Sequence, residues 1–527
     1  MKASVSMFIR CLCLLALFGA AERSVGSQPA SAWRTATPES QGIDSAALAD
    51  AIEGARKRGV NIHSFLLVRN GAIVAEAVFH PYDGRTPHDI ASITKPITTT
   101  LVGLAISQGK IESTRASMLS VFSSEAVANV ANVDDRKRRV TIDHLLTMSS
   151  GIGCKAQAGE PTLWEMLSAS NNVRFMLDLP MLAEPGSGYV YCSGGMHLLS
   201  GAISQKTGMS AENYARRHLF APLGIRTWIW PRDAQNVSHG FGNLHLLPRD
   251  MARLGQLFLD RGKWGGRQLV PAEWVAEATR SHIRTGGPGT SDYGYGWRVP
   301  PAGGPVGFEA GGRGGQLISV LPSKNAVVVL TGSGLNTGEW MKLILPAFRS
   351  DGALAENPAS LARLRAAIAE AARPPAPQPV AALPALAREI SGRVFELEPN
   401  WLGLRSIALV FRADAATATA RLQFGAALKQ FQFGASASVL GARVADEVRP
   451  VGLDGRLRIS GNGMLGLPVG LKGAWEDDRT FVLEYDEIAN TNAHRLRLQF
   501  DGDRVRVQAR ERTGLFNESY GGVARRN

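Results

Sequence analysis

Residues 88–96 read His88-Asp89-Ile90-Ala91-Ser92-Ile93-Thr94-Lys95-Pro96 and join a polar loop to an apolar, periodic segment. From Ser92 onward, apolar side chains recur at steps of three and four residues, which is the spacing of an amphipathic helix. They are Ile93, Ile97, Leu101, Leu104 and Ala105. Pro96 falls in the first turn, where a missing N–H is tolerated, and Gly109 stands where a helix would end. The sequence therefore predicts a helix that begins at Ser92 and ends before Gly109.

Ser92 and Lys95 are three residues apart, so they share one face of the predicted helix. Ser-x-x-Lys at a helix N-terminus is the arrangement of acyl-transferring serine hydrolases. In these the serine attacks, the lysine accepts or relays its proton, and backbone N–H groups stabilise an oxyanion. An N-cap serine beside a solvated lysine is the alternative that spacing alone leaves open. A second match, at 107–110, lies where the helix should end and is interpreted as capping.

The second stretch with chemical potential is 185–193, Pro-Gly-Ser-Gly-Tyr-Val-Tyr-Cys-Ser, which leads into an apolar segment expected to be helical. Tyr191 and Ser193 stand just before that helix, where both side chains could enter one cleft. We expect Tyr191 to act as base or proton shuttle, and Ser193 to bond Lys95 or the substrate. A buried tyrosine bonded to backbone is the alternative interpretation.

The third stretch is glycine-rich, from Gly307 to Gln316, and is followed by apolar runs at 317–321 and 326–330 that read as strands. Glycines at the end of a strand let the backbone approach a ligand closely and present N–H groups to it. A substrate could pair along that edge. A hairpin turn rich in glycine is the alternative.

Taken in this order, the three stretches resemble those of serine hydrolases related to penicillin-binding proteins and class C β-lactamases. Within that group the chain is similar to the branch of family VIII esterases and 6-aminohexanoate-dimer hydrolases. Ser92-Ile93-Thr94-Lys95 fits the first motif of that family. Tyr191-Cys192-Ser193 fits the second, usually Tyr-x-Asn, with serine in place of asparagine. The resemblance covers roughly residues 35–345 and implies Ser92 as nucleophile, with the base, Lys95 or Tyr191, left open.

The third motif departs from the family pattern. β-Lactamases carry Lys-Thr-Gly there and many esterases His-x-Gly, whereas this chain has Ala310-Gly311-Gly312. That strand therefore offers no cation to hold a β-lactam carboxylate, unless the neighbouring Arg313 does so. The same alignment implies an oxyanion hole made by the backbone N–H groups of Ser92 and Arg313, with Gly312 and Ser193 beside the substrate.

The fold class expected is α/β (α+β), a β-lactamase/transpeptidase-like domain over residues 28–347. Its antiparallel sheet would be flanked by helices and interrupted by a helical region, because the hairpin signal Asn70-Gly71 precedes the Ser92 helix. A helix and a Pro-rich linker should occupy 348–384. Alternating apolar residues then predict an all-β domain over 385–527, similar to lipocalin-like accessory domains. In it, Trp401 and Tyr485 could touch a substrate, but packing in the core suits them better.

Residues 1–27 have the pattern of a secretory signal, with a charged start, an apolar core and small residues at the end. We therefore expect an exported protein, periplasmic or secreted, without an integral membrane segment once the signal is removed. Of the four cysteines, Cys154 and Cys192 would remain, and in an oxidising compartment they could form a disulfide. The net charge of +12 comes from scattered basic residues, so no nucleic-acid partner is expected.

The expected function is that of a serine hydrolase working through an acyl-enzyme on ester or amide bonds of small substrates, including peptides. It would need no metal and no cofactor. Two alternatives remain. A D-amino-acid peptidase or β-lactamase requires Arg313 to clamp a carboxylate, and a penicillin-binding or sensor-like protein would acylate with little turnover. His88 and His239 are candidates for contacts behind the site or with substrate, though structural roles suit them better.

Overall fold

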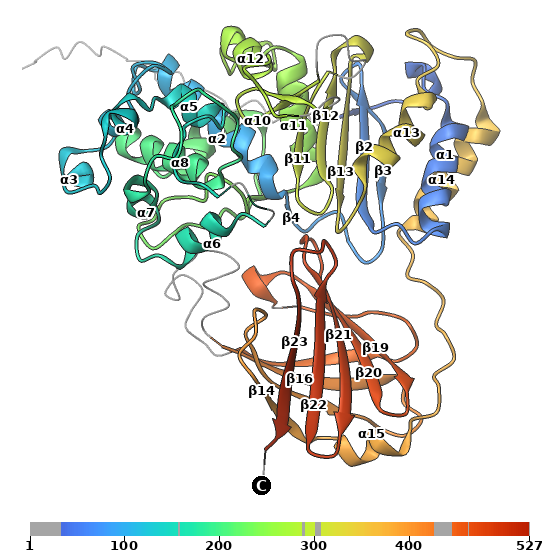
Figure 1. Cartoon of the computed structure of the whole chain (residues 1–527). Helices are drawn as coiled ribbons and strands as arrows, with labels where there is room; N and C mark the ends of the chain where they lie inside the picture. Colours follow the sequence, from blue (N-terminus) through green and yellow to red (C-terminus); the bar gives the residue numbers. More distant parts are fainter. Residues whose placement is uncertain are drawn as a thin grey trace, which may run out of the picture.

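The computed structural model describes residues 33–155, 157, 159–286, 290–300, 307–425, 445–461 and 463–525. A domain of mixed helices and strands is followed by an all-β domain (Figure 1). The proposed signal segment 1–27 lies outside the described residues. Among the described helices, none combines the length and apolar character needed to cross a membrane.

The first domain is built on one sheet, and all its pairings are antiparallel except that of the two strands at one edge. Across the sheet the described strands are β1 (Arg34–Thr35), β3 (Ala72–Val78), β2 (Ile62–Arg69), β13 (Ala326–Gly332), β12 (Gln316–Leu321), β11 (Phe308–Gly312), β10 (Arg298–Val299), β9 (Asp292–Tyr293) and β8 (Ile283–Arg284). The predicted hairpin is confirmed, since β2 and β3 pair through Arg69 and Ala72. Asn70 and Gly71 both take positive φ, as a tight hairpin turn requires.

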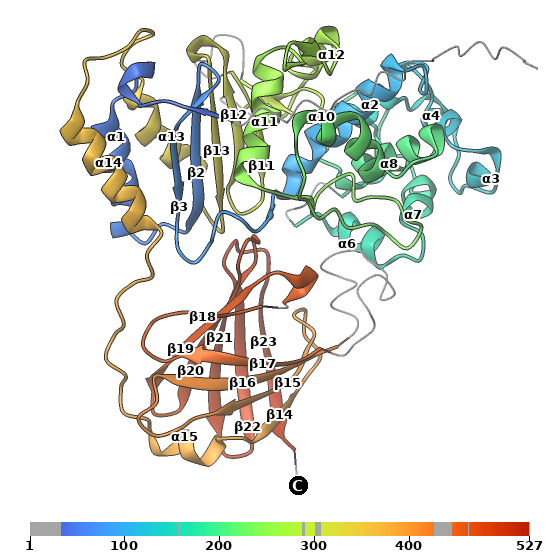
Figure 2. The ribbon, with the colours of Figure 1, turned by 180° about the vertical axis from the view of Figure 1, so that it is seen from behind.

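Helices cover both faces of this sheet, so β2 is buried along its whole length. Phe65 and Leu67 face a layer formed by α1 (Ser45–Lys57), α13 (Thr337–Ile344) and α14 (Pro358–Ala371). Leu66 and Val68 face the other side, where α11 (Pro248–Leu259) and the helical region lie (Figure 2). The alternation of strand side chains thus divides the apolar residues between two cores.

The helix predicted after residue 347 is α14, and it belongs physically to the first domain. Leu364, Ala367 and Ala371 are buried in the same core as α1. The extended linker therefore begins only after this helix, and residues 374–384 have no regular structure. The first domain extends further along the chain than the boundary at 347 predicted from the sequence.

The helical region, inserted between β3 and the later strands, holds the Ser92 helix as predicted. A 3-10 turn at Ala91–Ile93 leads into α2 (Thr94–Ser107), and Gly109 takes positive φ just beyond its end. Helix α2 packs against α8 (Ser193–Thr207), which follows the second motif. The stretch that carries Ser92 and the stretch that carries Tyr191 thus each adjoin a buried helix, which fixes their position.

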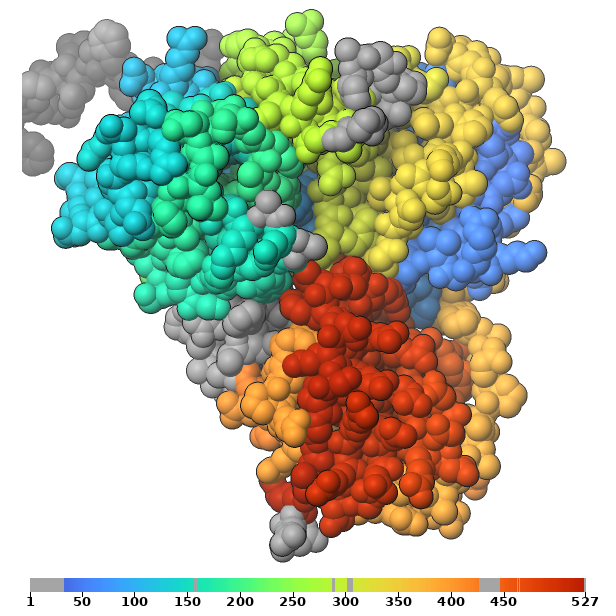
Figure 3. Space-filling model, in the orientation of Figure 1, coloured from blue at the N-terminus to red at the C-terminus, as the bar shows by residue number. Residues whose placement is uncertain are grey.

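The second domain confirms the predicted all-β architecture, and its sheet closes on itself through a contact between β17 and β19. After α15 (Ala385–Ile390), the described strands are β14 (Val394–Leu397), β15 (Leu404–Val410), β16 (Thr417–Phe424), β17 (Ala445–Gly452), β18 (Arg458–Ser460), β19 (Val469–Asp477), β20 (Thr480–Glu487), β21 (Ala493–Asp501), β22 (Arg504–Glu511) and β23 (Asn517–Ala524). Inward side chains such as Phe481 and Leu498 fill it. Its loops at one end abut the first domain, below the helical region and the sheet (Figure 3).

Candidate active site

The turn before Ser92 is held in an uncommon backbone conformation. Ala91 has φ 47°, a region that costs a residue with a Cβ about 1–2 kcal/mol. The Asp89 carboxylate accepts the Ala91 N–H at 2.8 Å, and the Thr94 hydroxyl donates to the Ala91 carbonyl at 2.8 Å. These bonds stabilise the turn and leave the Ser92 side chain partly exposed at the helix start.

Lys95 lies one turn further along the helix, and only 1% of its surface is exposed. Its Nζ donates to Ser92 Oγ at 2.8 Å and to the Phe241 carbonyl at 2.8 Å. Two fixed acceptors therefore hold the amine beside the serine oxygen. The alternative of a solvated lysine beside an N-cap serine does not describe this geometry.

Tyr191 reaches the same serine from the second motif, 99 residues along the chain. Its hydroxyl donates to Ser92 Oγ at 2.9 Å. Lys95 Nζ lies 4.7 Å from the centre of the Tyr191 ring. The structure thus brings the three predicted catalytic residues together around one oxygen, with both neighbours within hydrogen-bond distance of it.

Ser193 is buried at the start of α8, where its backbone N–H donates to the Glu160 carboxylate at 3.2 Å. The expected bond between Ser193 and Lys95 is not formed among the described residues, where Lys95 donates to Ser92 and Phe241 instead. A substrate contact by Ser193 stays a prediction. Glu160, which the sequence analysis did not single out, lies in the same pocket.

The end of β11 lies directly against the turn that carries Ser92. A Cβ on Gly312 would come within 2.6 Å of the Ile90 carbonyl oxygen. Glycine is therefore needed at this position of the Ala310-Gly311-Gly312 strand, and Arg313 follows immediately at the edge of the site. This placement suits the predicted pairing of the Ser92 and Arg313 N–H groups at an oxyanion, which stays a prediction.

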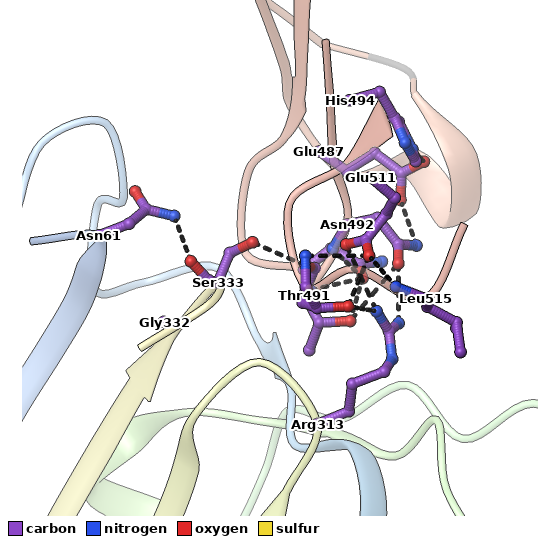
Figure 4. Close-up of polar contacts among 12 residues, drawn as sticks. Asn61, Arg313, Gly332, Ser333, Glu487, Thr491, Asn492, His494, Glu511 and Leu515 are labelled. Carbon is purple, nitrogen blue, oxygen red and sulfur yellow. Dashed lines mark hydrogen bonds and ion pairs between the residues drawn. The ribbon is translucent and has the colours of Figure 1, made fainter. Parts of the chain in front are cut away.

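The Arg313 side chain reaches into the second domain (Figure 4). Its guanidinium donates to Asn492 Oδ1 at 2.7 Å and to Thr513 Oγ1 at 3.2 Å, and it forms an ion pair with buried Glu511 at 3.6 Å. A carboxylate clamp would compete with these partners. Drawing the guanidinium away would leave the Glu511 charge buried and unpaired, which is costly.

A pocket of about 270 Å³ opens beside Ser92. The first domain lines it with Ala91, Ser92, Gly159, Glu160, Leu163, Trp164, Leu167, Ser193, Phe241, Gly242, Asn243 and Arg313, and the second domain with Trp401, Asn492, His494, Leu515 and Phe516. Trp401 combines the two interpretations offered for it, because its ring packs on the core of the second domain and also lines the pocket. Tyr485 is buried in that core, as expected.

The remaining predicted residues have structural surroundings. Cys154 and Cys192 are joined by a disulfide, which ties the segment next to Tyr191 to the loop after α5 (Ile142–Leu146). His88 and His239 are buried. His88 lies 2.8 Å from His63, nitrogen to nitrogen. The described residues hold no group of three or more histidine, cysteine or acidic side chains placed to bind a metal ion.

Electrostatics in and behind the site follow from burial. Desolvation, with the charge of Arg512, lowers the pKa of His63 from 6.5 to about 3. Desolvation, with the neighbouring His63, likewise lowers the pKa of His88 to about 3. Burial, with a contribution from Tyr191, raises the pKa of Tyr189 above its usual value, so this neighbour of the site stays protonated.

Residues 47–341, more than half of the chain, match the family model described as Beta-lactamase. The chain belongs to the beta-lactamase family. Penicillin-binding protein 4 of Amycolatopsis lactamdurans is 30% identical over 204 residues, which are 37% of this chain and 50% of that protein. The 6-aminohexanoate-dimer hydrolase of Paenarthrobacter ureafaciens is 25% identical over 240 residues, 40% and 55% of the two chains. Esterase EstB of Burkholderia gladioli is 26% identical over 213 residues, which are 36% of this chain and 53% of that protein.

This beta-lactamase family chain spans about half the length of these curated relatives. Among solved structures, a putative 6-aminohexanoate-dimer hydrolase from Bacillus anthracis is 17% identical with a TM-score of 0.49, covering 65% of this chain and 87% of that one. An octameric penicillin-binding protein homologue from Pyrococcus abyssi is 17% identical with a TM-score of 0.47, and the match covers 90% of this chain and 99% of that one. The family assignment depends on the family model and not on these structures.

Of the pocket residues that the sequence did not single out, those of the second domain are Asn492 in the loop before β21, His494 on β21, and Leu515 and Phe516 in the 512–516 loop. The first domain adds others, among them Glu160, Trp164 and Phe241. The polar run Asn490-Thr491-Asn492 between two strands marks a turn but says nothing of what the turn contacts. Trp401 and Phe516 are aromatic residues, which occur both in hydrophobic cores and in binding sites. Only the docking of the two domains distinguishes these possibilities.

Proposed function

We propose that this chain is a serine hydrolase that cleaves ester or amide bonds of small substrates through an acyl-enzyme on Ser92. The observation that carries the proposal is the convergence of Lys95 Nζ and Tyr191 OH on Ser92 Oγ, at 2.8 and 2.9 Å. A serine flanked by two groups able to move its proton, at the mouth of a pocket, is equipped for nucleophilic attack on a carbonyl.

In the proposed reaction, Ser92 Oγ attacks the carbonyl carbon while its proton passes to Lys95 or Tyr191. The N–H groups of Ser92 and Arg313 would hold the resulting oxyanion. As the tetrahedral intermediate collapses, the bond to the leaving group breaks and the proton is delivered to the departing oxygen or nitrogen. Water then attacks the ester on Ser92 by the same route, which releases the acid and restores the serine.

Two observations favour an esterase or amidase over a β-lactamase or D-amino-acid peptidase. The Ala310-Gly311-Gly312 strand carries no cation, and Arg313 is already bonded to Glu511, Asn492 and Thr513. The relatives named as an esterase and as a 6-aminohexanoate-dimer hydrolase support hydrolysis of an ester or a linear amide. We also propose that the protein is exported, since the Cys154–Cys192 disulfide suits an oxidising compartment.

The test is the intact mass of the protein after brief incubation with p-nitrophenyl butyrate, with nitrophenolate release followed in parallel and Ser92→Ala as control. We expect sustained release that disappears in the control. A single stoichiometric burst with a persistent butyryl adduct would support the sensor-like alternative instead. Neither release nor adduct in the folded protein would overturn the proposal.

A further inference from the structure

The pocket beside Ser92 has two apolar walls that belong to different domains. On one side lie Leu163, Trp164 and Leu167 of α6 (Pro161–Ser168). The other wall consists of Trp401, Leu515 and Phe516 of the second domain. Trp401 and Phe516 are stacked, with ring centres 4.3 Å apart and planes at 15°. Trp164 meets Phe516 edge-on at 5.4 Å, so the aromatic side chains are continuous across the domain boundary.

The loop that carries Leu515 and Phe516 is fixed by a buried charge. Glu511 accepts hydrogen bonds from the Thr513 N–H and hydroxyl and from the Leu515 N–H. The ion pair with Arg313 balances this carboxylate (Figure 4). The residue expected at the oxyanion edge therefore also holds the loop that forms the apolar wall.

Further bonds dock the second domain beside the nucleophile. The Asp89 N–H, three residues before Ser92, donates to the Ala489 carbonyl at 2.9 Å. On the other side, the Ser333 hydroxyl donates to the Thr491 carbonyl at 2.7 Å (Figure 4). Ile488 and Ala489 are buried against Tyr82 of the first domain. Polar and apolar contacts thus hold the second-domain wall of the pocket in a fixed position beside Ser92.

We propose that the second domain is part of the substrate-binding site, and that the interdomain pocket takes an aromatic or branched apolar group attached close to the scissile carbonyl. This rests on the proposed function and deepens it by naming the substrate class. Aromatic side chains offer large apolar areas and favour stacked or edge-on partners. The volume of about 270 Å³ lies near the lower end of that of ligand pockets, which suits a single ring and not an extended polymer.

The first measurement compares kcat/KM for p-nitrophenyl phenylacetate and p-nitrophenyl acetate, and for benzyl acetate and methyl acetate followed by acid release. We expect the aromatic substrate to be preferred by about 10- to 100-fold in one of the two pairs, the gain from burying a ring. Phe516→Ala should reduce that preference about tenfold. Val523→Ala, an exposed position on β23, is the matched control and should preserve it. The inference would be overturned if the aromatic and non-aromatic substrates had equal kcat/KM in both pairs, or if Phe516→Ala left the aromatic preference intact.

A second measurement separates this inference from the proposed catalysis. Binding of N-methyl-2-phenylacetamide, N-benzylacetamide and N-methylacetamide to Ser92→Ala, measured by calorimetry, needs no turnover. We expect the aromatic amide that matches the preferred ester pair to bind at least about tenfold more tightly than N-methylacetamide, and this advantage to shrink in Leu515→Trp, whose larger side chain would occupy the pocket. This variant also tests the inference if Phe516→Ala fails to fold. Equal binding of all three amides would overturn the inference, whereas selective binding without any ester hydrolysis would overturn only the proposed function.

Discussion

Lys95 Nζ lies 4.7 Å from the centre of the Tyr191 ring, and each side chain also donates a hydrogen bond to Ser92 Oγ. The contact places the Lys95 amine over an aromatic face in a largely buried setting. Because the two groups contact each other and the same oxygen, a change in one alters the setting of the other. They should therefore behave as one proton-transfer unit, and their removal should not be additive.

The first prediction concerns this unit. Tyr191→Phe and Lys95→Met should each lower kcat/KM for p-nitrophenyl butyrate by about 10²- to 10⁴-fold, the usual contribution of a positioned acid or base. The double variant should be at most about tenfold worse than the poorer single variant. Tyr189→Phe, the neighbouring tyrosine, is the control and should stay within about threefold of the unsubstituted protein. Independent, multiplying effects of the two single variants would contradict the shared role.

The second prediction concerns the contact between β11 and the nucleophile turn. Gly312→Ala should lower kcat by about tenfold or more, because its Cβ would lie 2.6 Å from the Ile90 carbonyl oxygen and displace the strand. Gly311→Ala is a matched control on the same strand, since the nearest atom to its Cβ is the end of the Arg298 side chain at 3.4 Å. Steady-state kinetics of both variants check this. An equal loss of kcat in Gly311→Ala and Gly312→Ala would show that the contact with the Ile90 carbonyl is not the cause.

The third prediction concerns the Cys154–Cys192 disulfide, which closes a loop with a sequence separation of 38. Replacing both cysteines with serine should lower the free energy of unfolding by about 3–4 kcal/mol, as the loop-entropy model predicts. Urea unfolding with and without reductant measures this. Reductant should destabilise the unsubstituted protein and leave the double variant unchanged, and a shift in the double variant would point to a different cause.

The fourth prediction concerns acid stability and follows from buried His63 and His88. Their pKa in the folded protein is about 3, against an ordinary value of 6.5, so the unfolded chain binds more protons between these pH values. Stability should therefore be complete above about pH 6.5 and fall as the pH drops, by up to about 1.4 kcal/mol per pH unit for each histidine. The free energy of unfolding, measured by urea from about pH 7 to about pH 5, should fall less steeply in His63→Gln. Identical slopes would contradict the assignment to this pair.

The sequence predicted the parts of the site that depend on local patterns. Helical spacing located the helix after Ser92, and the Asn70-Gly71 turn located the hairpin, because both signals lie within a few residues. The meeting of Ser92 with Tyr191 could not be derived from spacing, since the two are 99 residues apart. It was expected from the order of motifs shared with a family.

The second domain shows where sequence reasoning ended. Its alternating strands were predictable, because every second side chain must enter the core. Nothing in that alternation distinguishes the loops at the two ends of the sheet, so it could not decide between core and substrate contact for Trp401, and it gave no sign that Phe516 lines the pocket. The partners of Arg313 were hidden for the same reason, since Asn492, Glu511 and Thr513 are far along the chain.

The extended linker after α14 has a consequence for how this molecule is made and cut. During synthesis the first domain, with Ser92, Lys95 and Tyr191, leaves the ribosome before the loops of β20 to β23. A chain stopped at the linker, or cut there and separated from the second domain, would keep Ser92, Lys95 and Tyr191 but lose the side of the pocket formed by Trp401, Leu515 and Phe516. Under the proposed role of the second domain, a growing chain acquires its nucleophile before its selectivity, and loss of that domain would remove the selectivity first.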